Sequence, residues 1–408
     1  MSRWPTVALA ETATAKGLVG GPFGSSLVGA DYVESGVPVI RGTNLNGGRE
    51  LRGDYVFVSD AKVSSDLSRN VAKPGDLVFT QRGTLGQLAL VPSKPYPRYV
   101  VSQSQMRLRV DPEIASSSYL FYACSAPSFL RQINDNAIAT GVPHINLGIL
   151  ARLEVPFPGI NEQRAIGEVL GALDDKIAVN AAFVQTTEDL LSARFAALHL
   201  DEEPKPHNEA IRLDDVIELN PKIPAPSEIE PVYVDMQKLP VTGMSIAQWT
   251  HRPAKGGARF QNGDTLLARI TPCLENRKTA YVDFLDEGQV AIGSTEYIVM
   301  RSRPGVPSGL SFFLAISDRF RAFGIRHMLG TSGRQRLSAG DLRDYRLRAT
   351  DNVALESFGL ASKPLLVLVR RRTAETRTLI AMRDVLLPQL MAGKIRVKDA
   401  EQMLGDVV

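Results

Sequence analysis

Two long stretches of the chain place apolar residues at alternating steps of four and three. This spacing is typical of helices that bury one narrow face in a coiled coil. The predicted seam residues are Ile166, Leu170, Leu173, Ile177, Val184 and Leu191 in the first stretch, and Phe358, Leu365, Val369, Leu379, Leu386 and Leu390 in the second. We therefore expect two long helices of the same kind, against the alternative of two unrelated amphipathic surface helices. Pro364 should bend the second helix or mark its start.

The segments ahead of the two helices also repeat each other, in the same order. "KPGDLVFTQRGTLGQLALV" (73–91) and "QNGDTLLARITPCLENRKTAYV" (261–282) each combine a Gly-Asp turn, an apolar strand, a polar loop and a second strand. Segments 101–110 and 293–302 are likewise similar, and so are 141–158 and 330–350. An internal duplication is therefore predicted.

The strand signals are short and separated by Gly, Asp and Asn turns, with helical windows around 113–134 and 307–327, which indicates an α+β fold. The Pro-containing charged stretch "DEEPKPHN" predicts a linker. We expect a first globular domain over 1–158, a helix over 159–200, a linker over 201–208, a second domain over 209–350, a helix over 351–392, and a C-terminal tail over 393–408.

Composition narrows the class of protein but leaves its function open. The 408 residues, 44% of them hydrophobic, suffice for two packed domains, and the net charge of +3 is too small to reveal a nucleic-acid partner. Two distant cysteines fit a reducing compartment and form no metal-ligand cluster. No signal-peptide pattern opens the chain and no window is expected to resemble a membrane helix, so a cytoplasmic protein with no membrane partner is predicted.

With this repeat, the chain resembles the specificity subunit of type I restriction-modification systems over essentially its whole length. The resemblance is carried by "GGPFGSSL" (20–27), "VPVIRGTNL" (37–45), "GDLVFTQRGTLGQLALV" (75–91), "NEQRAIGEVLGALDDKI" (161–177), "GTSGRQRLSAGDL" (330–342) and "LLPQLMAGKIRV" (386–397). It implies two similar target-recognition domains, each followed by a long helix, with the helices packed antiparallel. Each domain would read one half of a split target in double-stranded DNA.

The same resemblance implies partner proteins. The helices would set the gap between the half-sites and dock two modification (methyltransferase) subunits, and a restriction (motor-nuclease) subunit would join the larger complex. S-adenosylmethionine, ATP and Mg²⁺ would be bound by those partners, so no cofactor or metal is expected on this chain. Its own sequence lacks a methyltransferase cofactor loop, a Walker motif and a Cys/His cluster, which predicts a chain that is not catalytic by itself.

Polar loop residues are the candidates for reading DNA, because Arg pairs with guanine and Asn or Gln with adenine through two hydrogen bonds. For each single residue, a turn-stabilising role is the alternative. The candidates in the first domain are Ser25, Ser26, Arg41, Asn44, Gln81, Arg82, Thr84, Gln103, Gln105, His144 and Asn146. Those in the second domain are Arg269, Thr271, Lys278, Thr295, Ser332, Arg334 and Gln335.

Three further features leave alternatives open. The "GPFGSSL" turn could hold a phosphate through backbone amides or be a plain tight turn. The arginine-rich stretch from Arg319 to Arg348 is a candidate for contacts with the DNA backbone, although part of it is expected to be an ordinary solvated surface. Arg370 to Arg372 could meet an acidic partner helix or DNA.

The expected length of the first helix suits a DNA target made of two separated half-sites. The 37 residues from Glu162 to Leu198 would span roughly 55 Å as a continuous helix, enough to separate half-sites about 34 to 36 Å apart. The helix would then act as a ruler. The alternatives are a duplicated coiled-coil scaffold that binds proteins rather than DNA, and an enzyme with an unrecognised site in the domain loops.

Overall fold

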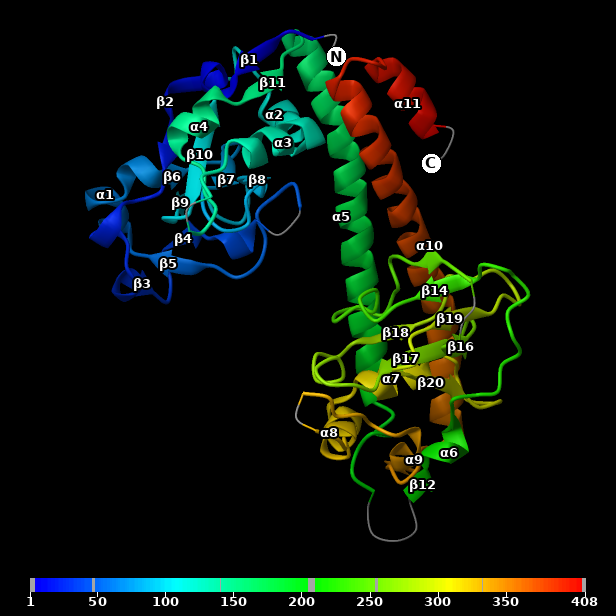
Figure 1. The fold of residues 1–408 in the computed structure, drawn as a ribbon. Helices are drawn as coiled ribbons and strands as arrows, with labels where there is room; N and C mark the ends of the chain where they lie inside the picture. The colour runs from blue at the N-terminus through cyan, green and yellow to red at the C-terminus, as the bar shows by residue number, and fades with distance from the viewer. Residues whose placement is uncertain are drawn as a thin grey trace. The chain divides into compact units, whose positions relative to one another are not determined.

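The computed structural model describes residues 4–45, 48–139, 141–204, 210–253, 256–331 and 333–405. It contains two compact units, one formed by Met1–Ile177 with Leu379–Val408 and the other by Ala178–Thr378. Two long helices, α5 (Ile160–Ala196) and α10 (Asn352–Met391), contribute residues to both units (Figure 1). Each unit therefore holds one globular domain together with parts of both helices.

The first domain is built on two sheets and a short two-stranded pair. A four-stranded sheet has the order β2-β10-β7-β8, a five-stranded sheet has the order β3-β5-β4-β9-β6, and β1 pairs with β11. The strands are β1 (Thr6–Ala8), β2 (Ala13–Gly20), β3 (Tyr32–Val33), β4 (Val37–Ile40), β5 (Val56–Val58), β6 (Val71–Ala72), β7 (Leu77–Thr80), β8 (Leu88–Leu90), β9 (Tyr99–Val101), β10 (Gln105–Val110) and β11 (Glu154–Pro156). The helices are α1 (Asp60–Ser65), α2 (Ser117–Ser125), α3 (Pro127–Asp135) and α4 (Leu147–Arg152), with short 3-10 turns that include η2 (Gly24–Ser26) and η4 (Gly42–Asn44).

The second domain follows the same plan. Its sheets have the orders β13-β20-β17-β18 and β15-β14-β19-β16, and β12 pairs with β21. The strands are β12 (Ala210–Arg212), β13 (Ile217–Leu219), β14 (Val232–Val234), β15 (Thr250–His251), β16 (Ala258–Phe260), β17 (Asp264–Ala268), β18 (Thr279–Tyr281), β19 (Ala291–Gly293), β20 (Tyr297–Ser302) and β21 (Arg346–Arg348). The helices are α6 (Leu213–Val216), α7 (Leu310–Ile316), α8 (Asp318–Arg326) and α9 (Ala339–Leu342). In both domains one parallel pair, β4 with β9 or β14 with β19, interrupts otherwise antiparallel pairing. The predicted α+β duplication is confirmed.

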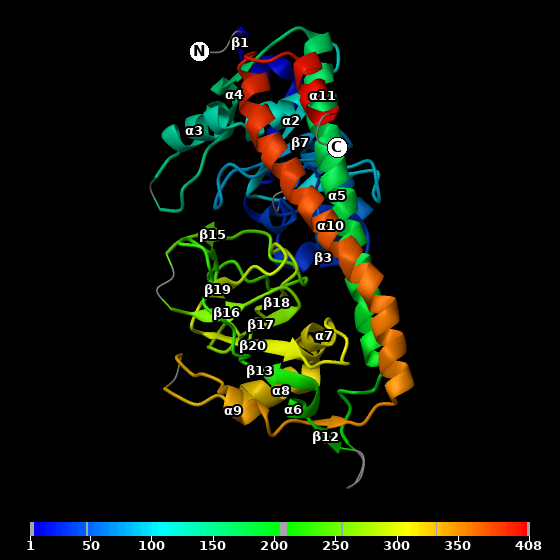
Figure 2. The same cartoon turned by 90° about the vertical axis from the view of Figure 1, so that its right-hand side faces the viewer.

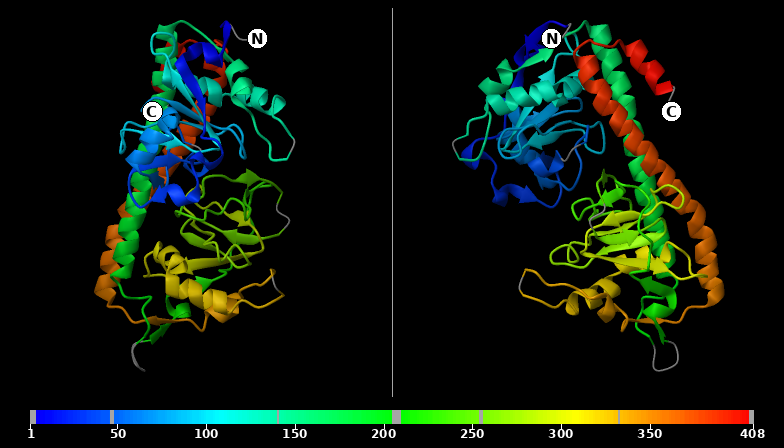
Figure 3. Two further views of the ribbon diagram at one scale, coloured as in Figure 1. Left: turned by 90° about the vertical axis from the view of Figure 1, so that its left-hand side faces the viewer. Right: turned by 45° about the vertical axis from the view of Figure 1, so that its right-hand side comes forward.

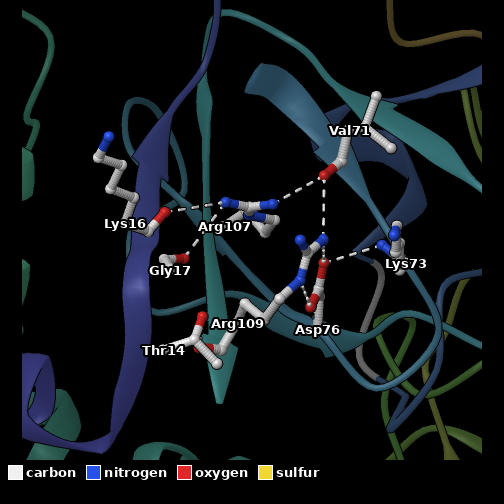
Figure 4. Close-up of polar contacts among 8 residues, drawn as sticks. All are labelled: Thr14, Lys16, Gly17, Val71, Lys73, Asp76, Arg107 and Arg109. Atoms are coloured by element: carbon white, nitrogen blue, oxygen red, sulfur yellow. Dashed lines mark hydrogen bonds and ion pairs between the residues drawn. The ribbon is translucent and has the colours of Figure 1, made fainter. Parts of the chain in front are cut away.

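A buried ion pair closes the Gly-Asp turn of the first domain. Asp76 is 3% exposed, and Arg109 on β10 donates to both of its carboxylate oxygens, at 2.9 and 2.7 Å. The same carboxylate accepts the Lys73 amide at 2.8 Å, so it also closes the turn (Figure 4). Gly75 has a φ of +84°, which a residue with a side chain rarely adopts. Charge and backbone geometry therefore explain why a Gly-Asp pair stands at this turn.

The second domain repeats this arrangement. Asp264 is fully buried and lies opposite Arg301 in the β17 and β20 ladder, and Arg301 donates to both of its oxygens at 2.6 and 2.8 Å. Asp264 also accepts the Gln261 amide at 2.9 Å, and Gly263 has a φ of +91°. The duplicated turn in the sequence is thus a duplicated buried salt bridge.

In the first unit, the start of α5 packs against the end of α10. Three residues of α5 share one hydrophobic core with three residues of α10. They are Ile166, Leu170 and Leu173 of α5 and Leu379, Leu386 and Leu390 of α10. Arg383 donates to Asp174 at 2.9 Å beside this seam. The two helix segments lie side by side, and the sheets of the first domain lie on one side of them (Figure 3). The helix α11 (Val397–Gly405) then occupies part of the predicted C-terminal tail and buries Ala400 in the same core.

In the second unit, the end of α5 packs against the start of α10 (Figure 2). The rings of Phe195 and Phe358 lie 6.4 Å apart, and Asn180 donates to Glu375 at 3.1 Å. Residue numbers therefore rise along one helix as they fall along the other, which is an antiparallel arrangement. Every predicted seam residue is buried or half-buried, so the predicted coiled-coil pairing is confirmed.

Two sequence expectations about α10 need correction. The helix begins at Asn352, so Pro364 lies in its interior and does not mark its start. Among the described residues, α10 is also long and apolar enough to cross a membrane, with a best 18-residue window of mean hydropathy 1.3, of which 17% is buried. The expectation that no window would reach this level was wrong, because the charges of α10 gather in and after Arg370 to Arg372. Phe358, Leu366 and Val369 of α10 pack into the core of the second unit.

Breaking one buried ion pair tests its part in the fold. Asp264→Ala leaves the Arg301 guanidinium without its carboxylate, and we expect the free energy of unfolding to fall by about 3 kcal/mol. Urea titration of the full chain measures this change. The double variant Asp264→Leu with Arg301→Met removes both charges and should recover most of the loss. A single variant as stable as the parent would contradict the proposed importance of the pair.

Glu188 on α5 gives the second unit a pH-dependent stability. It is 7% exposed and accepts the Met244 amide at 3.0 Å, and burial raises the pKa of its carboxyl to about 7. Between its ordinary pKa of 4.5 and this value, the unfolded chain releases the proton and the folded chain keeps it. Stability therefore falls as pH rises through this window, by up to about 3 kcal/mol.

Glu188→Gln keeps an acceptor for the Met244 amide and removes the titration. Urea unfolding at pH 5 and pH 8 should show a smaller stability loss for the variant than for the parent protein. Some loss should remain, because burial also raises the pKa of Asp283 to about 6, although Arg370 and Arg377 nearby oppose that shift. Equal pH dependence in variant and parent would refute the role of Glu188.

Candidate nucleic-acid interface

The polar loops of the first domain converge at one end of its sheets. The Gly21 amide donates to the Gln105 carbonyl at 2.8 Å, because β2 ends where the antiparallel β10 begins. The Gln81 amide donates to the Ser104 carbonyl at 2.7 Å, and the Ser102 amide to the Ile40 carbonyl at 3.0 Å. Four segments that are distant from one another in the sequence, at 20–27, 40–44, 80–84 and 102–105, therefore form one cluster. We call it the first loop cluster.

The segment that carries His144 and Asn146 joins this cluster. His144 pairs with Arg82 in an antiparallel bridge, and the Ile145 amide donates to the Gln81 carbonyl at 3.0 Å. The Gly83 amide donates to the Pro143 carbonyl at 3.3 Å. A loop more than fifty residues later in the chain is thus fixed against the "TQRGT" loop by main-chain hydrogen bonds.

Several candidates in the first loop cluster hold the protein together. Asn44 is 1% exposed, accepts the Arg41 amide and donates to the carbonyls of Arg52 and Asp54. Gln105 is 1% exposed and accepts the Ser102 hydroxyl. Asn146 caps α4 by accepting the Ile149 amide at 2.8 Å. This geometry favours a turn-stabilising role for these side chains over a contact with a base.

Other candidates present their side chains to solvent. Ser25, Arg82 and Thr84 are exposed, and Ser26, Gln81 and His144 are half-buried. Arg41 is half-buried and its Nε is a buried nitrogen with no hydrogen-bond partner within the described ranges. Ser25, Arg82 and Thr84 are therefore first-domain candidates whose side chains a DNA groove could reach, and their contact with DNA stays a prediction.

The second domain builds a corresponding cluster from its own loops. The Arg269 amide donates to the Glu296 carbonyl and the Thr271 amide to the Gln335 carbonyl, both at 3.0 Å. Ile270 pairs with Arg336 in an antiparallel bridge. We call this group the second loop cluster. It follows β17 and precedes β20, as the first loop cluster follows β7 and precedes β10.

A carboxylate organises two arginines in the second loop cluster. Arg269 Nε lies 3.2 Å from Glu296 Oε2, and Arg336 reaches Glu296 Oε1 at 2.9 Å. The Glu296 side chain is 22% exposed and that of Arg336 is 46% exposed, so Arg336 keeps part of its guanidinium open to solvent. Arg336 is not among the individual residues predicted from the sequence, although it alternates with the predicted Arg334 in "RQR". Ion pairs to one acid hold both guanidinium groups in place.

The remaining second-domain candidates divide between structural contacts and exposure. Lys278 Nζ donates to the Met236 carbonyl at 2.7 Å, and the Thr271 hydroxyl to the Gln335 carbonyl at 3.3 Å. Thr295 and Arg334 are exposed, and Gln335 is half-buried. Ser332 lies outside the described residues.

The arginine-rich stretch from Arg319 to Arg348 is largely used within the protein. Arg319 donates to the Tyr345 hydroxyl at 2.7 Å and Arg348 to Glu202 at 2.6 Å. Arg321 donates to the carbonyls of Leu274 and Glu275. These contacts favour the second loop cluster, with Arg334 and Arg336, as the part of this stretch that faces a ligand.

Within the described ranges, no three His, Cys, Asp or Glu side chains lie together in a way that could hold a metal ion.

Comparison with known proteins agrees with this architecture. Residues 26–185 match the family model described as the type I restriction modification DNA specificity domain. The MjaIX specificity subunit of Methanocaldococcus jannaschii is 19% identical over 376 residues, which cover 85% of this chain and 85% of that relative. Residues 26–185 thus carry the DNA specificity domain of type I restriction-modification systems, and the chain as a whole is similar to the specificity subunits of such systems.

Two further relatives give the extent of the match. The EcoEI specificity subunit of Escherichia coli is 25% identical over 218 residues, which cover 50% of this chain but only 36% of that relative. The crystal structure of a type I S subunit from M. genitalium has a TM-score of 0.59 and 17% identity, and the match covers 95% of this chain and 96% of that one. That likeness supports the fold.

These matches confirm the resemblance drawn from the sequence, and they favour DNA recognition over the protein-binding scaffold. The relatives are named for specificity, which indicates a non-catalytic role. A subunit of such a system works in a complex with other subunits and DNA. The individual DNA-contacting residues stay predictions.

Removing the acid of the second loop cluster tests whether it tunes DNA binding. Glu296→Ala frees the guanidinium groups of Arg269 and Arg336 and removes one negative charge from the cluster. Affinity for a scrambled duplex should rise while discrimination in favour of the specific target falls, because the guanidinium groups lose their fixed orientation. Dissociation constants at two salt concentrations, measured with the assembled complex, test this.

Glu287→Ala is the matched control, because it removes an exposed acid from the turn between β18 and β19. This control should leave the specificity ratio unchanged. The proposed role of Glu296 is wrong if both variants behave alike.

Proposed function

We propose that this chain reads a bipartite DNA target, with each loop cluster contacting one half-site. The observation that carries the proposal is the duplication of the cluster. In each domain, the ends of equivalent strands gather polar and basic loops that are distant in sequence, as at Gln81 beside Ser104 and Arg269 beside Glu296. Two readers built on one plan suit a target of two short segments separated by an unread gap.

The two clusters differ in the chemistry that they offer to bases. Amide, imidazole and hydroxyl groups dominate the first, whose exposed basic group is Arg82, whereas the second presents the exposed Arg334 and the half-exposed Arg336. Arginine pairs best with guanine and glutamine with adenine. We infer that the two half-sites differ in sequence and that the second is the richer in guanine contacts.

We further propose that α5 and α10 set the gap between the half-sites. The 37 residues of α5 give a helix of roughly 55 Å. Because α5 packs antiparallel against α10, it bends less easily than a single helix would. On this view, the length of the helix pair determines the spacing.

Both long helices also expose large apolar side chains. Large apolar side chains face solvent at Val179 and Leu190 on α5, which are 63% and 45% exposed, and at Leu360 and Val385 on α10, which are 73% and 56% exposed. Exposed apolar positions on a helix mark interaction surfaces when they gather. They support docking of two modification subunits along the helices, with a restriction subunit joining the complex, and we place this assembly in the cytoplasm.

Methylome sequencing of cells that carry this chain with a modification partner tests the proposal. A split methylated motif should appear. Adding four residues, about one turn or 6 Å, near Asn180 of α5 and near its partner Glu375 of α10 should lengthen the gap by one or two base pairs. Both half-sites should stay the same, because the loop clusters are untouched.

A continuous palindromic motif would overturn the bipartite proposal. An unchanged gap with altered half-sites would overturn the ruler. Salt-dependent binding of DNA is the signature of contacts with phosphates. If the purified complex bound partner proteins but showed no such DNA binding, the protein-binding scaffold would be the better description of its function.

A further inference from the structure

Phe23 is the most exposed large hydrophobic side chain among the described residues, with 90% of its surface accessible. It stands in the middle of "GGPFGSSL", between the end of β2 and η2. Single exposed apolar residues are common on protein surfaces and need no explanation by themselves. Phe23 differs from such residues in two ways: hydrogen bonds fix the turn that carries it, and that turn belongs to the first loop cluster.

The turn that carries Phe23 is held firmly on both sides. Pro22 fixes the backbone before it, and Gly24 follows with a φ of +53°. The Gln103 amide group donates to the carbonyls of Gly24 and Leu27, both at 2.9 Å. A substituent on Gly21 would lie 2.0 Å from the Ser102 carbonyl oxygen, so only glycine permits this close approach.

These contacts show that Gln103 and Gln105 support the turn that carries Phe23. The side chain of Gln103 and the main chain of Gln105 fasten the Phe23 turn to the 102–105 loop, the centre of the first loop cluster. Phe23 thus stands on a preorganised support beside the segments that carry Arg82 and His144. Because Gly21 and Gly24 have no side chains, little bulk surrounds the ring at its base.

We propose that Phe23 is an apolar wedge that enters the DNA and stacks against the bases of the half-site read by the first domain. The proposal rests on the DNA-reading function proposed above. Apolar side chains inserted between base steps unstack them and kink the duplex. A rigid, narrow turn tipped by an aromatic ring suits this task, because little freedom is lost when the ring enters.

The second domain has no matching wedge in its sequence. The segment that follows β13, "NPKIPAPSEIEP" (220–231), contains no aromatic residue. Its exposed aliphatic side chain, Ile229, precedes β14, whereas Ser294 to Glu296 follow β19, which runs parallel to β14. Ile229 therefore lies at the opposite end of that sheet from the second loop cluster. The wedge should deform one half-site only.

The experiment uses the complex of this chain with its modification subunits and a duplex carrying the motif found by methylome sequencing. The fluorescent base 2-aminopurine, which brightens when unstacked, replaces one adenine at a time in each half-site. The modification subunits are expected to flip out the adenines that they methylate, so those positions are left unsubstituted. At the other adenines, the parent complex should show a fluorescence rise at a step of the first half-site only. Phe23→Ala should abolish that rise and weaken specific binding by roughly 10- to 100-fold, the scale of one lost stacking contact.

Matched variants separate stacking from folding. Phe23→Trp should restore both signals, because it keeps an aromatic face. Ile229→Ala removes a side chain that is 89% exposed and should change neither signal. Binding to a scrambled duplex should be the same for all variants.

The outcomes distinguish this inference from the proposed function. Unchanged specific binding and unchanged fluorescence for Phe23→Ala would overturn the wedge while DNA recognition stands. If the parent complex failed to prefer its motif over the scrambled duplex, DNA recognition itself would fail.

Discussion

The buried Asp-Arg pair at the Gly-Asp turn is the constraint on which each domain depends. A carboxylate that is nearly or fully inaccessible is tolerated only with an opposite charge and hydrogen bonds, and Asp76 and Asp264 each receive both. In the second domain the pair fixes which residue of β17 faces which residue of β20, since a slip of one residue would leave a buried charge unpaired. The loops beyond these strands are therefore positioned by an ion pair at the far end of the ladder.

The helices carry the second constraint, which is the burial of two apolar seams. Each unit buries its own part of α5 against its own part of α10, and polar contacts interrupt the seam at Asp174 with Arg383 and at Asn180 with Glu375. Such interruptions cost stability in coiled coils and fix the register of the partners. Register matters here because a helix pair that could slide would not define a length. The apolar residues that face solvent on these helices are the surface on which the proposed function places the partner subunits.

The chemistry of the loop side chains differs between two domains that share one backbone plan. The same strand ends present glutamine, serine and histidine in the first loop cluster, and arginines held by Glu296 in the second. A fixed framework with exchangeable loop chemistry allows the target to change while the fold stays intact. Phe23 adds an element of shape to the first cluster, so that the ease of deforming the DNA contributes to specificity beside direct base contacts.

The sequence alone determined the duplication, the two helices and their seam, because heptad spacing and repeated Gly-Asp turns are local patterns. It also named the loops that meet in each cluster, since strands of a repeated sheet end together. Tertiary structure decided which side chains are available. In the folded chain, Asn44 and Gln105 are buried and stabilise turns. Arg336 pairs with Glu296, and Phe23 is exposed. None of this follows from local sequence, because burial and hydrogen bonding depend on segments far away in the chain. A polar residue in a loop looks the same in sequence whether it faces a carbonyl of its own protein or the solvent, and only the packed fold separates the two.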